Sequence, residues 1–232
     1  MPVGCIVNSL GVVLGGVLGA MFGKYLPARV QESLPHVFGF SSMLIGVSLM
    51  VQVDNLSAAV LALIVGTVIG ELLRIETRID AGVRWAQSRV LRGANITADQ
   101  MDSLLSVLVL FCASGTGIFG ALNEGMTGDS SILMAKTILD IPTAAIFAVS
   151  LGVIVAAIAI PQIVIFLGLY SLAGLIVPLM TEPMLGDFRA VGGVLTFVAG
   201  FRILKIKQVR LTNIVPAIIL VPIFSAVFAM LG

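Results

Sequence analysis

The stretch "GTGIFGALNEGMTGDSSILMAKTILD", residues 115–140, gathers a glutamate, two aspartates and a lysine in a chain that is 59% hydrophobic and only 11% charged. The chain has 232 residues and a mean hydropathy of +1.14. Apolar runs of about 18–20 residues recur on both sides of the stretch, and each is long enough to cross a hydrocarbon core ~30 Å thick as a helix. The sequence therefore predicts an all-α polytopic membrane protein, in which this polar stretch needs an explanation.

The number of spans follows from the spacing of the apolar runs. We predict about eight transmembrane helices, some of them broken or re-entrant. The opening "MPVGCIVNSL" lacks the basic segment of a secretory signal, so we expect the first run to remain as a span. The expected spans cover residues 4–23, 36–53, 56–73, 101–122, 131–160, 161–180, 190–204 and 212–231.

The positions of the basic residues favour this count. Of the 13 lysines and arginines, Lys136 falls inside the fifth span and Arg189 follows the sixth, while all others follow the first, third or seventh. The positive-inside rule assigns the side that holds these others to the cytoplasm, so both termini and residues 123–130 are expected outside. The residues on the cytoplasmic side are Lys24, Arg29, Arg74, Arg78, Arg84, Arg89, Arg92, Arg202, Lys205, Lys207 and Arg210.

We expect a single transmembrane domain, 1–232, made of two units. An N-terminal three-helix unit covers residues 1–74, and a C-terminal five-helix unit covers residues 98–232. Between them, in residues 75–97, apolar side chains recur every three or four positions among arginines. That pattern predicts an amphipathic helix on the inner membrane surface, with Trp85 at the interface.

The letters Gly115, Gly117 and Gly120 match the G-x-G-x-x-G pattern of dinucleotide-binding sites. That pattern requires a preceding strand and a βαβ unit, and a membrane helix offers neither. We therefore interpret these glycines as positions of close helix packing or of a break in the helix. Nucleic acid and nucleotides are not expected partners.

A glycine stripe runs along the first span at four-residue spacing. Small residues at this spacing let two helices approach closely inside a membrane. Packing within one protomer and dimerisation both fit the pattern, and a pore lining is a lesser alternative. We expect a homo-oligomer, with a dimer favoured. The stripe consists of Gly11, Gly15, Gly19 and Gly23.

Lys136 and Asp140 are the sharpest functional signal in the sequence. They lie four residues apart, so they share a helix face and can pair. At 1.5 Å per residue from a helix start near Ser131, Asp140 lies about 14 Å deep, near the middle of the membrane. Intramembrane ionisable residues usually mark a pathway, although a purely structural pair stays an alternative. Pro142 follows two residues later and favours a helix break that could expose backbone ligands.

Polar neighbours extend this candidate site along the fourth span and the following turn. Because an antiparallel hairpin would bring them toward Lys136, we predict that they line the site. Anion recognition by the lysine with backbone N–H groups and cation or proton coupling through carboxylates both fit. Asp129 and Ser130 are also natural helix N-caps. The lining set is Ser114, Thr116, Asn123, Glu124, Asp129 and Ser130.

Other residue types argue against catalysis. Cys5 and Cys112 lie in apolar stretches and lack zinc-ligand spacing, and His36 is the only histidine. We therefore expect no catalytic residues, no metal and no cofactor. Asn8 and Asn213 stand at matching places near the starts of the first and last spans, which would suit an inverted repeat, although two interfacial caps are the preferred explanation.

Several stretches together resemble a known family. The stretch "TGDSSILMAKTILD" (127–140), preceded by "FCASGTGIFGALNEG" (111–125), and the later stretches "AVGGVLTFVAGFRILKI" (190–206) and "LTNIVPAIIL" (211–220) are similar to the YqgA-like family of bacterial inner-membrane proteins. The stretch "IGELLRIE" (69–76) and the glycine-rich first span match as well. The family has no established function, and the resemblance implies a polytopic bacterial inner-membrane protein, loosely described as a transport protein.

From these observations we predict a transporter of a small solute or ion in the bacterial inner membrane. Lys136, Asp140 and Glu124 would carry the site, and broken helices near residues 115–120 and Pro142 would supply backbone ligands. An ion channel with the same polar lining is the first alternative. A non-transporting scaffold or sensor, with its arginine-rich helix as the cytoplasmic contact, is the second.

Overall fold

The computed structural model describes residues 1–25, 27–79, 81–82, 104, 107–108, 110–112, 114–176 and 180–231, and all secondary structure in this part of the chain is helical. Within it, seven helices are long and apolar enough to cross a membrane. The predicted all-α membrane fold is therefore confirmed. The described helices are α1 (Val3–Phe22), η1 (Gly23–Tyr25), α2 (Ala28–Met50), α3 (Leu56–Leu73), α6 (Gly115–Thr127), α7 (Ser131–Leu151), α8 (Ile154–Ala157), α9 (Ala159–Ile176), α10 (Glu182–Ile203), η3 (Leu211–Ile214) and α11 (Pro216–Leu231).

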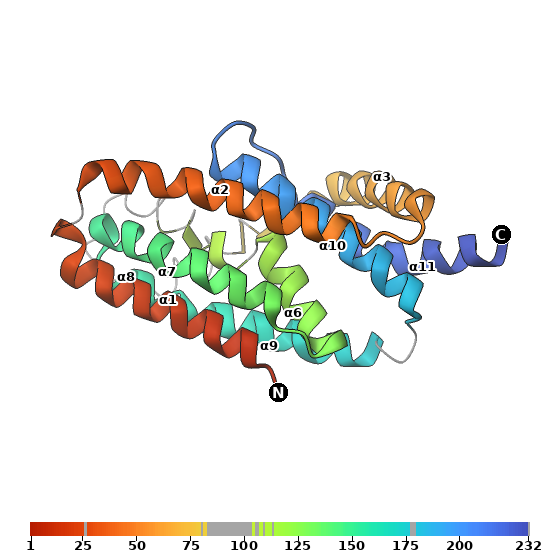
Figure 1. The fold of residues 1–232 in the computed structure, drawn as a ribbon, viewed down its shortest axis with the longest axis horizontal. Helices are drawn as coiled ribbons and strands as arrows, with labels where there is room; N and C mark the ends of the chain where they lie inside the picture. The colour runs from red at the N-terminus through yellow and green to blue at the C-terminus, as the bar shows by residue number, and fades with distance from the viewer. Residues whose placement is uncertain are drawn as a thin grey trace.

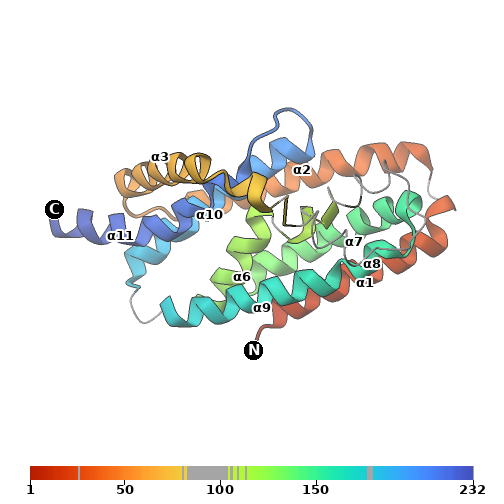
Figure 2. The ribbon, with the colours of Figure 1, turned by 180° about the vertical axis from the view of Figure 1, so that it is seen from behind.

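Each of the first three long helices packs mainly against a helix from much later in the chain. α1 lies along α7, α2 lies along α10, and α3 lies along α11, while α6 pairs with α9. Figures 1 and 2 show α1, α7 and α8 toward one end of the long axis and α3 and α11 toward the other. The predicted surface helix over residues 75–97 falls mostly outside the described residues, of which 75–79 and 81–82 are helical.

The glycine stripe of α1 faces α7 inside the chain. A side-chain carbon on Gly15 would collide with the carbonyl oxygen of Ile141, and one on Gly19 would collide with that of Ala145. All four glycines of the stripe are buried. The stripe is therefore occupied within the protomer and offers no surface to a second copy. Here the absence of side chains lets two backbones meet in the membrane, where apolar burial alone would not hold them together.

The hairpin that follows α7 lies earlier in the chain than the sequence predicted. α7 ends at Leu151, and Gly152 takes a left-handed backbone with φ of 74°, which reverses the chain into α8 and α9. The predicted boundary at residues 160 and 161 was therefore wrong. Pro161 lies in the first turn of α9, where a missing N–H costs no helical hydrogen bond. The proline was a correct sign of a helix start, but the glycine marks the turn.

Two other predicted spans were too short, because both helices begin earlier than predicted. α10 begins at Glu182 rather than at residue 190, because Thr181 has an extended backbone and Pro183 follows in the first turn. Arg189 is thus part of α10 and not of an outer loop. α2 begins at Ala28, so His36 lies inside the helix rather than at its start. Polar side chains in the first turns had made these segments read as loops.

The predicted helix break near the glycines is confirmed, but it lies just before them. Residues 110–112 are helical, Ser114 is extended with φ of −68° and ψ of 141°, and α6 starts at the next residue. The Ser114 hydroxyl oxygen accepts a hydrogen bond from the N–H of Gly117 at 3.1 Å. Gly117 and Gly120 lie inside α6, in close contact with Phe166 and Leu133.

The break predicted at Pro142 was wrong, because α7 continues through it without interruption. The packing of α1 explains the continuity. Gly11 contacts Thr137 before the proline, and Gly19 contacts Ala145 after it. The same partner therefore supports α7 on both sides of the position where one backbone hydrogen bond is lost.

Two buried carboxylates hold the starts of two helices. Glu124, at the end of α6, accepts hydrogen bonds from the N–H groups of Gly4 at 2.7 Å and Cys5 at 3.0 Å, in the first turn of α1. Asp187 of α10 accepts from the N–H groups of Asp54 at 2.9 Å and Asn55 at 2.6 Å, just before α3. The first N–H groups of a helix have no partner within the helix, and an anion there also interacts favourably with the helix dipole.

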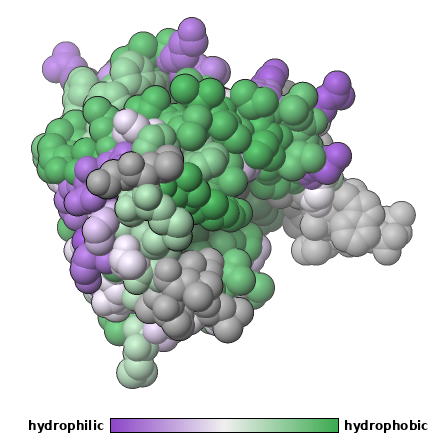
Figure 3. Space-filling view, turned by 90° about the vertical axis from the view of Figure 1, so that its right-hand side faces the viewer, coloured by the Kyte–Doolittle hydropathy of each residue, from purple (hydrophilic) through white to green (hydrophobic). Residues whose placement is uncertain are grey.

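Large apolar side chains cover much of the outside. Leu44, Ile64 and Ile219 are among those that are more than half exposed. Hydrophobic residues dominate the face shown in Figure 3, with hydrophilic residues gathered toward its edges. Such a surface suits contact with lipid rather than with water.

The α1–α7 contact gives a test of the packing. We expect Gly15→Ala to lower the free energy of unfolding by about 1–3 kcal/mol, because the added methyl group must push apart two backbones. Gly168→Ala in α9 is the matched control, since nothing lies within 4 Å of the position of its added carbon. The control should be neutral or slightly stabilising, because alanine favours helix more than glycine does. Thermal unfolding in detergent measures both, and equal midpoints would contradict the packing.

The Glu124 contact gives a second test. We expect Glu124→Ala to destabilise the protein by roughly 1–3 kcal/mol, because two buried N–H groups lose their partner. The start of α1 should then loosen, so the buried thiol of Cys5 should react faster with a maleimide. Glu182→Ala is the control, because that glutamate is exposed at the start of α10. An unchanged rate of Cys5 labelling in the Glu124 variant would show that the carboxylate does not hold α1.

Candidate functional site

The site is built around the charge pair of α7. The Lys136 ammonium donates to Oδ2 of Asp140 at 2.5 Å, as the four-residue spacing had suggested. Both residues are buried, with 4% of Lys136 and 7% of Asp140 exposed. Asp140 lies nine residues after the start of α7, so it is about 14 Å along the helix, near the middle of a membrane.

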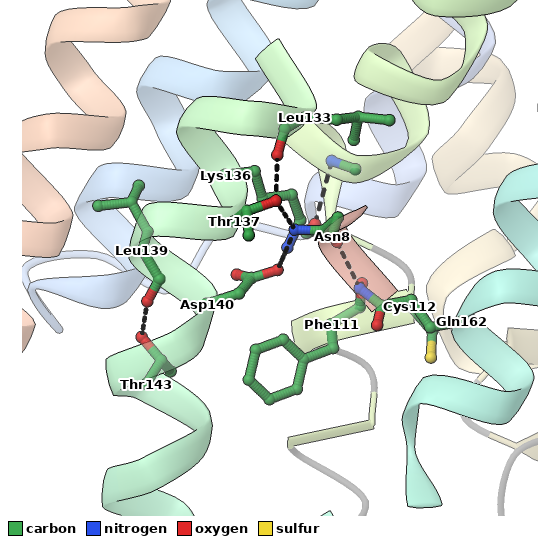
Figure 4. A network of polar contacts seen from close by, with 12 residues as sticks. Asn8, Phe111, Cys112, Leu133, Lys136, Thr137, Leu139, Asp140, Thr143 and Gln162 are labelled. Carbon is green, nitrogen blue, oxygen red and sulfur yellow. Dashed lines mark hydrogen bonds and ion pairs between the residues drawn. The ribbon is translucent and has the colours of Figure 1, made fainter. Parts of the chain in front are cut away.

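α1 contributes an amide to this pair. Asn8 Nδ2 donates to Oδ2 of Asp140 at 3.0 Å and to the hydroxyl oxygen of Thr137 at 3.3 Å. The Thr137 hydroxyl in turn donates to the carbonyl of Leu133 at 2.7 Å. Figure 4 shows Asn8 entering from α1 between these side chains. Asp140 Oδ2 thus receives two donors, and the two acceptors reached by Asn8 Nδ2 fix the orientation of the Asn8 amide.

α9 extends the network with a second amide. Gln162 Nε2 donates to Oδ1 of Asn8 at 2.7 Å and to the carbonyl of Phe111 at 3.4 Å. Two acceptors on the same side determine which end of the Gln162 amide is nitrogen. Its oxygen, Oε1, is therefore turned away from them, and within the described part of the chain it is buried without a hydrogen-bond partner. A buried acceptor without a partner is rare in folded proteins and calls for an explanation.

Besides α7, α1 and α9, the helical residues just before the break at Ser114 also contribute to the site. The Phe111 ring lies with its centroid 5.6 Å from the Lys136 ammonium, within the range of a cation–π interaction. Its carbonyl receives the Gln162 amide, as described above. The cluster therefore joins α1, α7, α9 and residues 110–112 at the level of the helix break (Figure 4). We name Asn8, Phe111, Lys136, Thr137, Asp140 and Gln162 the central cluster.

The electrostatics of the central cluster are balanced but costly. The charges of Lys136 and Asp140 cancel, so the cluster carries no net charge. Removing two charges from water costs several kcal/mol for each ion, and the attraction between them often does no more than offset it. Replacing a buried ion pair by well-packed apolar residues is often neutral or stabilising. The pair therefore contributes little net stability, because the free energy lost on desolvation offsets most of the attraction between the two charges.

The structure separates Glu124 from this cluster. Its carboxylate binds the amides of Gly4 and Cys5, and Lys136 pairs with Asp140 instead. Its placement as a site residue beside Lys136 is therefore corrected to a role at the start of α1. The sequence could not show this role of Glu124, because it does not reveal that the end of α6 lies beside the start of α1.

The other expected lining residues lie along α6 and its hairpin. Asn123 Nδ2 donates to the carbonyl of Asp129 at 3.2 Å, and its buried oxygen has no partner among the residues that the structure describes. Asp129 is exposed and caps α7 by accepting from the N–H of Ser131 at 2.9 Å, whereas Ser130 makes no side-chain cap. These contacts shape the turn and do not reach the charge pair.

Two more expected residues lie near the break. Ser114 caps α6, as described above, and Thr116 is buried in the first turn of that helix. No contact joins either of them to Lys136 or Asp140. The antiparallel α6–α7 hairpin itself is present as predicted, with Gly128 in a left-handed conformation at its turn.

Asn8, Thr137 and Gln162 were missed as site residues. Asn8 had been interpreted as an interfacial cap or a repeat signature, although it lies inside α1. Gln162 is fully buried and is the one amide side chain in the strongly apolar helix α9, which was a usable signal. An amide in the middle of an apolar span needs a partner as much as a charge does.

Among the described residues, no group of three or more histidine, cysteine, aspartate or glutamate side chains gathers as a metal site would. The central cluster instead offers one carboxylate, one ammonium, two amides and a hydroxyl. Such a set can bind and release a small polar molecule or ion through hydrogen bonds and charge.

Comparison with known proteins identifies relatives along the whole chain. The family model described as "Protein of unknown function (DUF554)" matches residues 3–226. "Uncharacterized protein YqgA" from Escherichia coli (strain K12) is 46% identical over 228 residues, 97% of each chain. "Uncharacterized membrane protein YdfK" from Bacillus subtilis (strain 168) is 24% identical over 234 residues, which covers 99% of this chain and 98% of the relative.

No solved structure matches the chain. The resemblance to the YqgA-like family is confirmed by these matches, and the membrane name of the second relative agrees with the apolar helices. Because the family model covers nearly the whole sequence, the chain belongs to the DUF554 family of proteins of unknown function.

Proposed function

We propose that this protein is a membrane transporter of a small solute or ion, and that the central cluster is its binding site. The observation that carries the proposal is the Lys136–Asp140 pair, buried near mid-membrane and contacted by amides from two other helices. Intramembrane ionisable residues usually mark the path of a substrate or ion.

The energetics of the pair support a functional reading over a structural one. A structural pair would need no further polar residues, yet Asn8 and Gln162 add two buried amides to the cluster. Among the described residues the oxygen of Gln162 has no partner, and a buried polar group without a partner costs free energy. A binding site has such unused capacity, whereas a completed structural network does not.

The break before α6 supports the same proposal. Transporters place substrate sites where discontinuous helices expose backbone groups at membrane depth. Here residues 110–112 end beside the central cluster, and Ser114 interrupts the helix. We further propose a bacterial inner-membrane location, with the basic loops in the cytoplasm and both termini outside.

The transport proposal is tested in proteoliposomes. Vesicles would be loaded with a panel of isotope-labelled alkali cations, halides, carboxylates and amino acids, and the loss of each would be followed. We expect at least one member to leave faster than from protein-free vesicles. Lys136→Gln and Asp140→Asn should each slow that efflux at least tenfold, because each leaves an unpaired charge in the cluster. Lys207→Gln, in an exposed loop, is the control and should transport normally.

The opposite outcome is equally clear. If no member of the panel moves, and a double replacement of Lys136 and Asp140 by leucine raises the unfolding temperature, the pair is structural and the transport proposal is wrong. Stepwise single-channel currents in a planar bilayer would show a channel instead.

The orientation has its own test, because exposed residues flank α10. Glu182 lies at its start, and Lys207 lies in the loop that follows it. We expect a membrane-impermeant maleimide to label Glu182→Cys in intact cells, and to label Lys207→Cys only after the cells are opened. The native cysteines are both buried and should stay unlabelled. The reverse pattern would place the basic loops outside.

A further inference from the structure

The charge balance of the central cluster restricts what the site can take. Lys136 and Asp140 together are neutral, and both are buried. A bound anion would leave one negative charge in excess in this enclosure, and a bound cation would leave one positive charge in excess. An uncompensated charge is the least favourable state in a membrane interior. A ligand with no net charge leaves the balance intact.

The unused hydrogen-bonding groups add a second restriction. Gln162 is linked to Asp140 only through Asn8, so its oxygen, which has no partner among the described residues, is not counted here. Lys136 carries three N–H donors, and its contacts among the described residues are Asp140 and the Phe111 ring. A ligand that separates the pair must therefore offer an acceptor to Lys136 and a donor to the Asp140 carboxylate. An anion alone would satisfy only the lysine, and a cation alone would satisfy only the oxygen atoms.

The pair can also open without moving a helix. Lys136 and Asp140 belong to the same helix, so the flexible lysine stem alone controls their separation. Asp140 is held in place by Asn8, whereas the Lys136 ammonium has a second favourable neighbour in the Phe111 ring at 5.6 Å. A ligand with two opposite charges can enter between them, with its positive group on Asp140 and its negative group on Lys136.

We propose that the central cluster binds a small zwitterion, an amino-acid-like molecule with an ammonium and a carboxylate close together, inserted between Asp140 and Lys136. The proposal rests on the transport function proposed above and names its substrate class. No bond to the ligand forms or breaks in the site. The ion pair within α7 is exchanged for two ion pairs with the ligand, and the net charge of the site stays zero.

Matched probes separate the three charge classes. The free amino acid glycine carries both groups, acetate carries only the carboxylate, and methylammonium carries only the ammonium. Alanine, propionate and ethylammonium repeat the set with one more carbon. Binding is measured by the shift in unfolding temperature of the full chain in detergent, and transport by uptake of the isotope-labelled compounds into proteoliposomes.

For the unmodified protein, we expect one of the two zwitterions to bind at least tenfold more tightly than its singly charged analogues. Lys136→Gln should reverse the preference toward the ammonium compounds, because Asp140 then stands alone. Asp140→Asn should reverse it toward the carboxylates, because Lys136 then stands alone. Lys207→Gln should leave the preference of the unmodified protein unchanged.

A neutral double variant guards against loss of folding in the single ones. Lys136→Gln combined with Asp140→Asn keeps the side-chain sizes and leaves no buried charge, so it should fold and lose at least tenfold in zwitterion affinity. Zwitterion binding at the original strength in this variant would overturn the proposal. So would equal or tighter binding of acetate or methylammonium, or their larger analogues, by the unmodified protein.

The two proposals fail in distinguishable ways. If a singly charged ion is transported, and Lys136→Gln or Asp140→Asn stops it, the zwitterion proposal is wrong and the transport proposal stands. If none of these compounds or the wider panel moves, both are wrong.

Discussion

The hydrogen bond from Asn8 to Asp140 is the contact on which the rest of the arrangement depends. A carboxylate near the middle of a membrane must be neutralised and enclosed by protein. Lys136 neutralises it from the same helix, but only another helix can enclose it, and α1 does so with an amide at 3.0 Å. That short distance requires the two backbones to come close together. The glycine stripe of α1 meets this requirement, since any side chain on Gly15 would collide with α7.

The sequence predicted the class of fold and the centre of the site, and the physical reason is the same for both. Apolar length defines a span, and a charge inside a span stands out against it, so the helices and the Lys136–Asp140 pair could be recognised from local pattern. What the sequence could not show was contact between distant helices. Asn8 and Gln162 are 154 positions apart and meet only because α1 packs against α9 as well as against α7. Nothing local distinguishes such an amide from an interfacial cap.

The errors of the sequence reading also have local causes. Gly152 and Pro161 compete as turn signals, and only the left-handed backbone of Gly152 settles which one reverses the chain. Glu124 and Asp187 look alike in the sequence as acids near span ends. In the structure, each accepts hydrogen bonds from backbone N–H groups at the start of another helix. The burial of an acid near a span end can be explained by the N–H groups of a nearby helix start, which have no partner within their own helix. The described hydrogen-bond partners of Asp140 are the side chains of Asn8 and Lys136 rather than the N–H groups of a helix start, so its burial points to the central cluster.

The pairing of early helices with late ones has a consequence for how the protein is made. Asn8 and Asp140 are separated by 132 positions, and at a synthesis rate of 5–20 residues per second, roughly 7 to 26 s pass between them. During that interval α1 has no α7 to lie against. Its buried amide and its bare glycine backbone must be met by lipid, by the insertion machinery or by a temporary neighbour. α2 and α3 face the same delay, because α10 and α11 are made last. The nascent chain is therefore a set of incomplete helices until its C-terminal third arrives, and the insertion machinery must tolerate three early helices whose final partners do not yet exist.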